Sequence, residues 1–247
     1  MALCQSVPSF EAASIRLNKD SQGRGNMEFL PGGERFSATH VPLGALIQTA
    51  YNLTSPQCSC YSSAVPVLLE NYDIQAKAER PVSPAEMLRL LQDLLQNRFK
   101  LVLRHETKEL QAYAMVVDKG GPKLRASSTA HVNDAAPLNP YHARGVEGHS
   151  YYALDIMIKD ATMADLAWRL SSLTILEDHV VIDKTGLAGH YDLDLKFSGV
   201  SPTEPLSGND APSIFTALRE QLGLRLDAQK ISLEVLSVEH AERPAEN

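Results

Sequence analysis

The segment with the most chemically suggestive residue types is Asp183-Lys184-Thr185-Gly186. An aspartate in this setting is the type of residue that accepts a phosphoryl group in ion pumps. Such a pump also needs a nucleotide-binding domain and a membrane domain, and 247 residues do not hold them. We therefore favour a strand that ends in a tight turn, because Asp and Thr side chains bond nearby backbone N–H groups and glycine accepts a positive φ. The turn could still mark a surface for a partner.

A tyrosine–aspartate pair occurs twice in the chain, as Tyr72-Asp73 and as Tyr191-Asp192. Such a pair is better explained by packing than by catalysis, since tyrosine can bury its ring and keep its hydroxyl at the surface. We assign no catalytic residue. The candidate binding residues are Asp183, Lys184, Thr185, Gly186, Gly189, Tyr191 and Asp192.

Histidines and cysteines could hold a metal, but their spacing is unfavourable. His131, His142 and His149 lie in a polar stretch, and His105 lies beside a glutamate. Ligands this far apart on a loop do not form a preorganised site. We therefore predict neither a metal nor a cofactor.

The three cysteines are Cys4, Cys58 and Cys60. The Cys58-Ser59-Cys60 spacing is shorter than the redox C-x-x-C pattern and is close for an ordinary disulfide. We expect these cysteines to be incidental thiols in a loop.

Composition restricts the class of protein. The apolar fraction of 44% suffices for a core, and the net charge of −7 argues against a general nucleic-acid binder. No apolar run is long enough to cross a bilayer, so we expect no integral membrane segment. No signal peptide is visible at the N-terminus, which indicates the cytoplasm unless a leader lies upstream.

Apolar periodicity places the helices and strands. Helices are expected from Pro42, after Ser83, over Thr162–Leu173 and over Pro212–Leu222, the last ended by Gly223; Ser83-Pro84-Ala85-Glu86 is a capping box. The strands expected from alternation are 10–18, 35–39, 72–78, 153–158, 179–182 and 191–197. Two hairpins are expected, over 100–117 with a turn at 105–109 and over 224–238. Residues 21–33 are read as a turn-rich stretch.

The two halves of the chain resemble each other in order and spacing. Val41 corresponds to Ala161 and Tyr72 to Tyr191, at offsets of 120 and 119 positions. Phe99 corresponds to Leu222 at an offset of 123 positions. The small differences fall in loops, where insertions cost little. This pattern indicates an internal duplication.

We therefore predict an α+β fold of two similar lobes, each a small mixed sheet with two helices in the order β-α-β-α-β-β. The expected boundaries are 9–125 for the first lobe, 126–148 for a linker, 149–240 for the second lobe and 241–247 for a tail.

Several blocks carry a family resemblance. They are 10–18, 35–43, 95–101, Tyr113–Leu124, Val181–Asp192 and Leu222–Leu226. Together they resemble the soil-associated family of uncharacterised proteins abundant in acidobacteria, over nearly the whole chain. The resemblance implies a periplasmic or secreted protein. Each half is also similar, more weakly, to the short N-terminal domain of secretins and TonB receptors, which mediates protein–protein contacts in the envelope.

The function that these observations favour is a non-enzymatic binding module of the bacterial envelope, whose partner is another envelope protein. An exposed sheet edge could pair with a strand of that partner. Two alternatives stay open: a hydrolase with a pocket between the lobes, and an accessory domain that senses a ligand. The oligomeric state is open as well.

Overall fold

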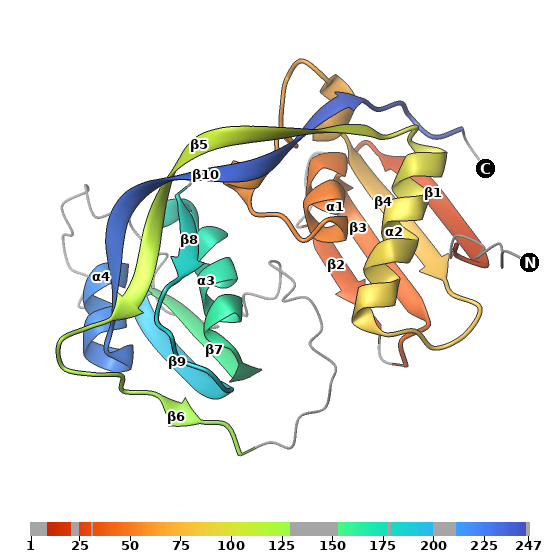
Figure 1. The fold of residues 1–247 in the computed structure, drawn as a ribbon. Helices are drawn as coiled ribbons and strands as arrows, with labels where there is room; N and C mark the ends of the chain where they lie inside the picture. Colours follow the sequence, from red (N-terminus) through yellow and green to blue (C-terminus); the bar gives the residue numbers. More distant parts are fainter. Residues whose placement is uncertain are drawn as a thin grey trace, which may run out of the picture. The chain divides into compact units, whose positions relative to one another are not determined.

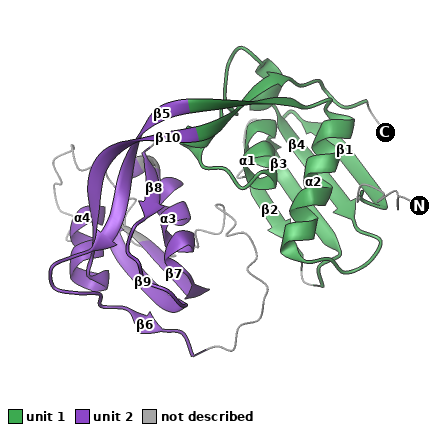
Figure 2. Ribbon diagram, in the orientation of Figure 1, with its two compact units in different colours: residues 1–107, 134–141, 234–247 green, residues 108–133, 142–233 purple. Residues whose placement is uncertain are grey.

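The computed structural model describes residues 9–20, 25–30, 32–128, 153–176, 179–199 and 211–245. These described residues form two compact units (Figure 2). Of the described residues, those up to 107 and from 234 onward belong to unit 1, and those between 108 and 233 belong to unit 2. Most of the predicted linker, residues 129–148, lies outside the described residues.

Unit 1 is built on a four-stranded sheet of order β1-β4-β3-β2 (Figure 1). The strands are β1 (Ala12–Asn18), β2 (Asn26–Phe29), β3 (Arg35–Pro42) and β4 (Asn71–Lys77). All three pairings are antiparallel, so the prediction of a mixed sheet is wrong for this unit. Strand β2 lies in the stretch predicted as turn, because Met27 and Phe29 follow too few apolar neighbours to reveal the alternation.

Two helices, α1 (Leu43–Ala50) and α2 (Pro84–Arg98), cover one face of this sheet (Figure 1). Both were predicted, and their apolar faces meet the buried residues of β3 and β4. The largest fully buried side chains of the unit include Tyr72, Phe36, Phe99, Met27 and Leu43. Two short 3-10 turns, η1 (Ser55–Gln57) and η2 (Pro66–Leu69), lie between α1 and β4.

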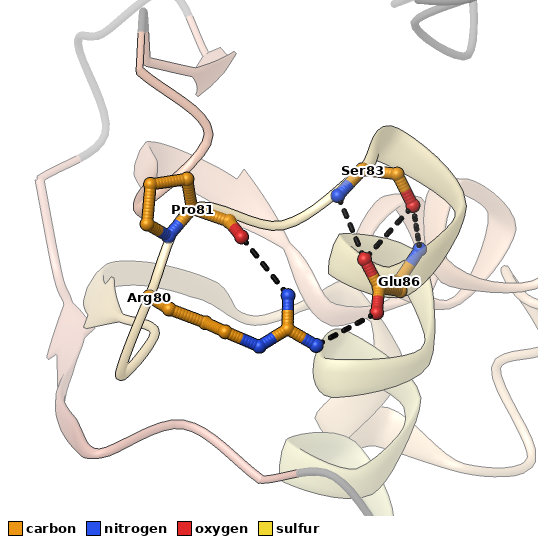
Figure 3. A network of polar contacts seen from close by, with 4 residues as sticks. All are labelled: Arg80, Pro81, Ser83 and Glu86. Carbon is orange, nitrogen blue, oxygen red and sulfur yellow. Dashed lines mark hydrogen bonds and ion pairs between the residues drawn. The ribbon is translucent and has the colours of Figure 1, made fainter.

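The predicted capping box at the start of α2 is confirmed (Figure 3). The Ser83 side chain accepts the Glu86 N–H at 3.3 Å, and the Glu86 carboxylate accepts the Ser83 N–H at 2.9 Å. Arg80 donates to the other oxygen of that carboxylate at 3.1 Å. These bonds hold the pKa of Glu86 below its usual value, with the Ser83 N–H as the main cause.

Unit 2 contains a three-stranded sheet of order β6-β9-β7. Its strands are β6 (Arg125–Ala126), β7 (Ala153–Ala161) and β9 (Tyr191–Ser198), all antiparallel. Helix α3 (Met163–Ser171) begins at a capping box on Thr162 and is followed by the turn η3 (Thr174–Leu176). Helix α4 (Ile214–Ala217) continues as the π-helical turn η4 (Leu218–Leu222) and ends at Gly223 in the left-handed conformation, as predicted.

The two predicted hairpins are wrong. Each is one continuous strand, β5 (Val102–Val117) and β10 (Leu224–His240), which share a sheet of order β10-β5-β8 with β8 (Val180–Asp183). The segment expected to turn, His105–Glu109, contains no glycine, proline or asparagine, so nothing favours a reversal there. Its charged side chains instead pair with β10, as His105 does with Glu234 and Glu109 with Lys230 at 2.9 Å.

The C-terminal residues are held within unit 1. The Glu242 N–H donates to the Phe99 carbonyl at 2.7 Å, and the Arg243 guanidinium pairs with both oxygens of Glu70. The Tyr72 hydroxyl donates to the same carboxylate at 2.9 Å. Hydrogen bonding from Arg243 lowers the pKa of Glu70, while burial and Glu70 raise the pKa of Tyr72.

Replacing Ser83 with alanine removes the acceptor for the first-turn N–H of α2. We expect Ser83→Ala to lower the free energy of unfolding by about 1 kcal/mol. Urea denaturation measures this change, with Ser63→Ala at an exposed loop position as the control. Equal midpoints for the two variants would contradict the role assigned to the cap.

The Glu70–Arg243 pair predicts a pH-dependent stability. Because the folded pKa of Glu70 lies below its ordinary value, the pair stabilises the fold above the unfolded pKa and this stabilisation is lost as the pH falls through the folded pKa. We expect Arg243→Gln to destabilise the protein at neutral pH and much less in acid. Urea titrations at both pH values check this, and an equal loss at both would be inconsistent with the pair.

Candidate functional site

The turn after β8 has the structure that its residue types predict. The Asp183 carboxylate accepts the Thr185 N–H at 2.9 Å and the Thr185 hydroxyl at 2.7 Å. The Thr185 hydroxyl oxygen accepts the Leu187 N–H at 3.2 Å, and Gly186 has a φ of 68°. The carboxylate of Asp183 therefore holds the turn, and the side chain of Lys184 lies exposed between these residues.

This turn lies at the carboxyl end of a parallel strand pair, where α/β folds commonly bind ligands. Strands β5 and β8 are parallel, and the Lys184 N–H donates to the Met115 carbonyl at 2.9 Å. The loop after β5 bonds in turn to the end of η4, since the Asp118 N–H donates to the Gly223 carbonyl at 2.9 Å. Three of the blocks that carry the family resemblance thus meet in unit 2.

Gly223 shows why the residue types at this junction are restricted. Its φ is 66°, and a Cβ atom there would lie 2.2 Å from the Gly121 carbonyl oxygen. Any other residue would therefore displace the loop after β5. This cluster stabilises the fold of unit 2 through the backbone hydrogen bonds of Asp118 and Lys184 and the close packing at Gly223.

The second group of candidates, Tyr191 and Asp192, lies at the start of β9. Asp192 faces a bulge in β7, where Asp160 has a φ of 54°. Its carboxylate accepts the Asp160 N–H and the Lys159 ammonium, both at 3.3 Å. The Asp160 N–H is the main cause of the lowered pKa of Asp192. The Tyr191 hydroxyl donates to the Ala188 carbonyl at 2.9 Å.

The same arrangement occurs in unit 1 around Asp73. His40 lies in a bulge of β3 with a φ of 54°, and its N–H donates to the Asp73 carboxylate at 2.8 Å. Asn18 of the flanking strand β1 donates to the same oxygen at 2.9 Å. The repeated aspartate therefore binds the backbone of a left-handed residue in both units.

Neighbouring side chains also correspond in the two units. The Asn71 side chain contacts the His40 ring at 3.2 Å, and the His190 ring contacts the Asp160 carbonyl at 2.9 Å. Tyr72 is fully buried, including the hydroxyl that was expected at the surface, whereas Tyr191 is only half-buried. Gly189 has a φ of 110°, which a non-glycine residue rarely adopts.

The outer face of the β6-β9-β7 sheet carries residues that sequence reasoning did not single out. Met157 of β7 is 66% exposed, the highest value among the exposed large hydrophobic residues of the described chain. Asp155 lies opposite Lys196 of β9, and Met157 lies opposite Asp194. The one available signal was an apolar residue at an alternating position that is normally polar.

Asp155 lies near both a like charge, Asp194, and an opposite charge, Lys196. One of its carboxylate oxygens is buried and has no hydrogen-bond partner. Desolvation and the nearby charge of Asp194 raise its pKa.

Side chains cover two strand edges of unit 2. The Gln221 amide bonds both the N–H and the carbonyl of Lys196 in β9, at 2.9 and 2.7 Å. The Ser171 hydroxyl accepts the Val181 N–H of β8 at 2.7 Å. In the part of the chain that the structure describes, β7 bonds to β9 on one side and has no such cover on the other.

Cys58 and Cys60 form a disulfide, so the prediction of incidental thiols is wrong for this pair. Their Cα atoms lie 5.1 Å apart, within the usual range for a disulfide. This distance is shorter than the roughly 6.5 Å between alternate residues of an extended strand, so the chain bends at Ser59 and brings the two side chains together. The Ser59 N–H bonds the Leu236 carbonyl at 3.0 Å, so the linked loop lies on β10.

The remaining candidates do not assemble into a site. His131, His142 and His149 lie outside the described residues, and His105 pairs with Glu234. Among the residues that the structure describes, no group of three or more histidine, cysteine or acidic residues could hold a metal ion. The described helices are also too short or too polar to cross a membrane.

The aspartate that binds the left-handed residue predicts a stability effect. Asp73→Ala removes the acceptor for the His40 N–H and for Asn18, so we expect the free energy of unfolding to fall by about 1–3 kcal/mol. Urea denaturation measures it, with the exposed Glu79→Ala as the control. A loss no larger than that of the control would show that the bulge does not depend on this carboxylate.

Comparisons with known proteins place the chain in a family. No curated protein and no solved structure matches significantly. A family model described as "Protein of unknown function (DUF3738)" matches residues 44–241. This match covers most of the 247 residues, and we conclude that the chain belongs to the DUF3738 family.

Proposed function

We propose that this protein is a non-enzymatic interaction module that binds a strand of another polypeptide at the open edge of β7. The carrying observation concerns the strands that the structure describes in each unit. In unit 1, β2 pairs with the edge of β3 that faces away from β4. In unit 2, no described strand pairs with the edge of β7 that faces away from β9. Strands β3 and β7 are equivalent strands of the two units under this proposal.

Their equivalence follows from the internal duplication, which we propose as the origin of the two units. The strand triple β1-β4-β3 corresponds to β6-β9-β7, with the same antiparallel pairings. Both bulges contain a residue with a φ of 54°, His40 and Asp160, at an offset of 120 positions. A second pair of left-handed residues, Lys100 and Gly223, ends α2 and η4 and differs by 123 positions.

Chance is a poor explanation for this correspondence between the two units. Left-handed conformations are uncommon for residues other than glycine, and His40, Lys100 and Asp160 all adopt them. The distances of 120 and 123 positions between the paired left-handed residues equal the offsets of the apolar pattern, and that pattern does not depend on backbone conformation. The correspondence supports the view that the place beside β7 is a strand position.

A strand position of this kind has a definite chemistry. An edge strand presents unpaired N–H and carbonyl groups, which an extended segment can complete by hydrogen bonding. The nine residues of β7 are long enough for such pairing, and Met157 offers an apolar contact. The charged residues around Met157 would set the register of the added strand.

We also propose that the protein works in the bacterial envelope, as a periplasmic or secreted protein. This proposal rests on the resemblance to the soil-associated acidobacterial family and on the weaker likeness of each half to the short N-terminal domain of secretins and TonB receptors. Those domains make protein–protein contacts, which agrees with an edge-binding role.

A photo-crosslinking amino acid at position 157 tests the proposed binding edge. We expect cross-links from this position in cells of the native host, and far fewer from position 119, an exposed loop residue of the same unit. Mass spectrometry identifies the polypeptide that is captured and the segment involved. Equal yields from the two positions, or none from either, would refute an interaction at β7.

A further inference from the structure

We propose that the occupant of the β7 edge is β7 of a second copy of this chain, paired antiparallel about Met157. This inference rests on the proposed function and names its partner. The pairing would place the two Met157 residues opposite each other and join the two sheets into one of order β6-β9-β7-β7-β9-β6.

Antiparallel pairing about Met157 makes β7 complementary to itself. Residues at equal distances on either side of the centre become opposite neighbours, so Asp155 faces Lys159 of the second copy. The same relation holds with the two copies exchanged. Opposite residues of neighbouring strands point to the same face and approach within about 5 Å, so each pair can form an ion pair.

The charges already present on β9 extend this complementarity across the sheet. Lys196 lies opposite Asp155, and Asp192 bonds the Lys159 ammonium at 3.3 Å. Four charged residues therefore lie in one row across the joined sheets. They are Lys196 and Asp155 of one copy, followed by Lys159 and Asp192 of the second copy. The signs alternate along the row, and the symmetry-related row has the same alternation.

The state of Asp155 provides an independent argument for this occupant. Its buried carboxylate oxygen has no hydrogen-bond partner, and Asp194 lies nearby with the same charge. An ammonium group approaching from the edge would add to the attraction of Lys196 and offset the repulsion from Asp194. Lys159 of a second copy, the first residue of the bulge and two positions beyond Met157, would supply this group.

The central residue of the pairing, Met157, would bury its apolar side chain. Met157 is 66% exposed in the single chain and would contact its own counterpart across the twofold axis. Charged residues on edge strands normally prevent such pairing. Here, Asp155 and Lys159 lie at equal distances from the centre with opposite sign, so self-pairing brings attraction where most edges would bring repulsion.

Sedimentation equilibrium of the full chain over a wide concentration range tests the proposal. We expect a reversible dimer. Asp155→Lys and Lys159→Asp each place like charges opposite each other, so each should raise the dimer dissociation constant about tenfold or more. The double variant Asp155→Lys/Lys159→Asp restores opposite charges across the interface, although it places like charges beside Lys196 and Asp192 within each copy, so it should dimerise more tightly than either single variant. Lys119→Asp, at an exposed loop residue, controls for net charge.

The double variant separates self-pairing from other causes of weakened association. A misfolded single variant would show a lowered thermal midpoint, and a double variant would not repair that fault by restoring a charge pair. A monomer at every concentration, or a double variant no tighter than the single variants, would overturn self-pairing. A monomer that still forms cross-links to another polypeptide at position 157 overturns the self-pairing alone, whereas a monomer without such cross-links overturns the binding edge as well.

Discussion

One hydrogen bond, from a backbone N–H to an aspartate carboxylate, occurs once in each unit and organises the β1-β4-β3-β2 and β6-β9-β7 sheets. In each unit a strand bulges at a residue with positive φ, and an aspartate of the neighbouring strand accepts its N–H. A left-handed residue within a strand is costly and leaves its N–H out of register with the ladder. The carboxylates of Asp73 and Asp192 supply the missing acceptor and so make the bulge tolerable.

The bulge determines where the strand after it can go. Strand β3 leads through its bulge into α1, and β7 leads through its bulge into α3, so each helix starts directly after the irregularity. The bulge ends the regular part of β7 at Ile158, so Asp155 and Met157 lie on the regular edge and Lys159 is the first residue of the bulge. The proposed binding surface thus depends on the local geometry that Asp192 maintains.

The sequence predicts the helices and most strands because their apolar periodicity and caps are local signals. Ser83, Thr162 and Gly223 each mark a helix end correctly. The continuous strands β5 and β10 were missed because their pairing joins residues more than a hundred positions apart. No local pattern distinguishes a long strand from two short ones when charged residues occupy its middle.

Two of the candidate binding residues have structural roles in the fold. Asp183 and Asp192 carry out structural hydrogen bonding, in agreement with the turn predicted for the first and the packing role predicted for the second. The functional surface proposed here lies instead on Met157 and its charged neighbours. It could not be read from the sequence, because the exposure of a strand edge depends on which strands pair and not on the residues of the strand itself.

Residue-specific amide hydrogen exchange in β7 tests the central claim most directly. If a second copy completes this edge, every second amide of β7, those directed away from β9, exchanges slowly at high protein concentration. The same amides become fast on dilution or in Asp155→Lys, while the amides bonded to β9 stay protected. Exchange rates that do not depend on concentration for either set of amides would contradict the account.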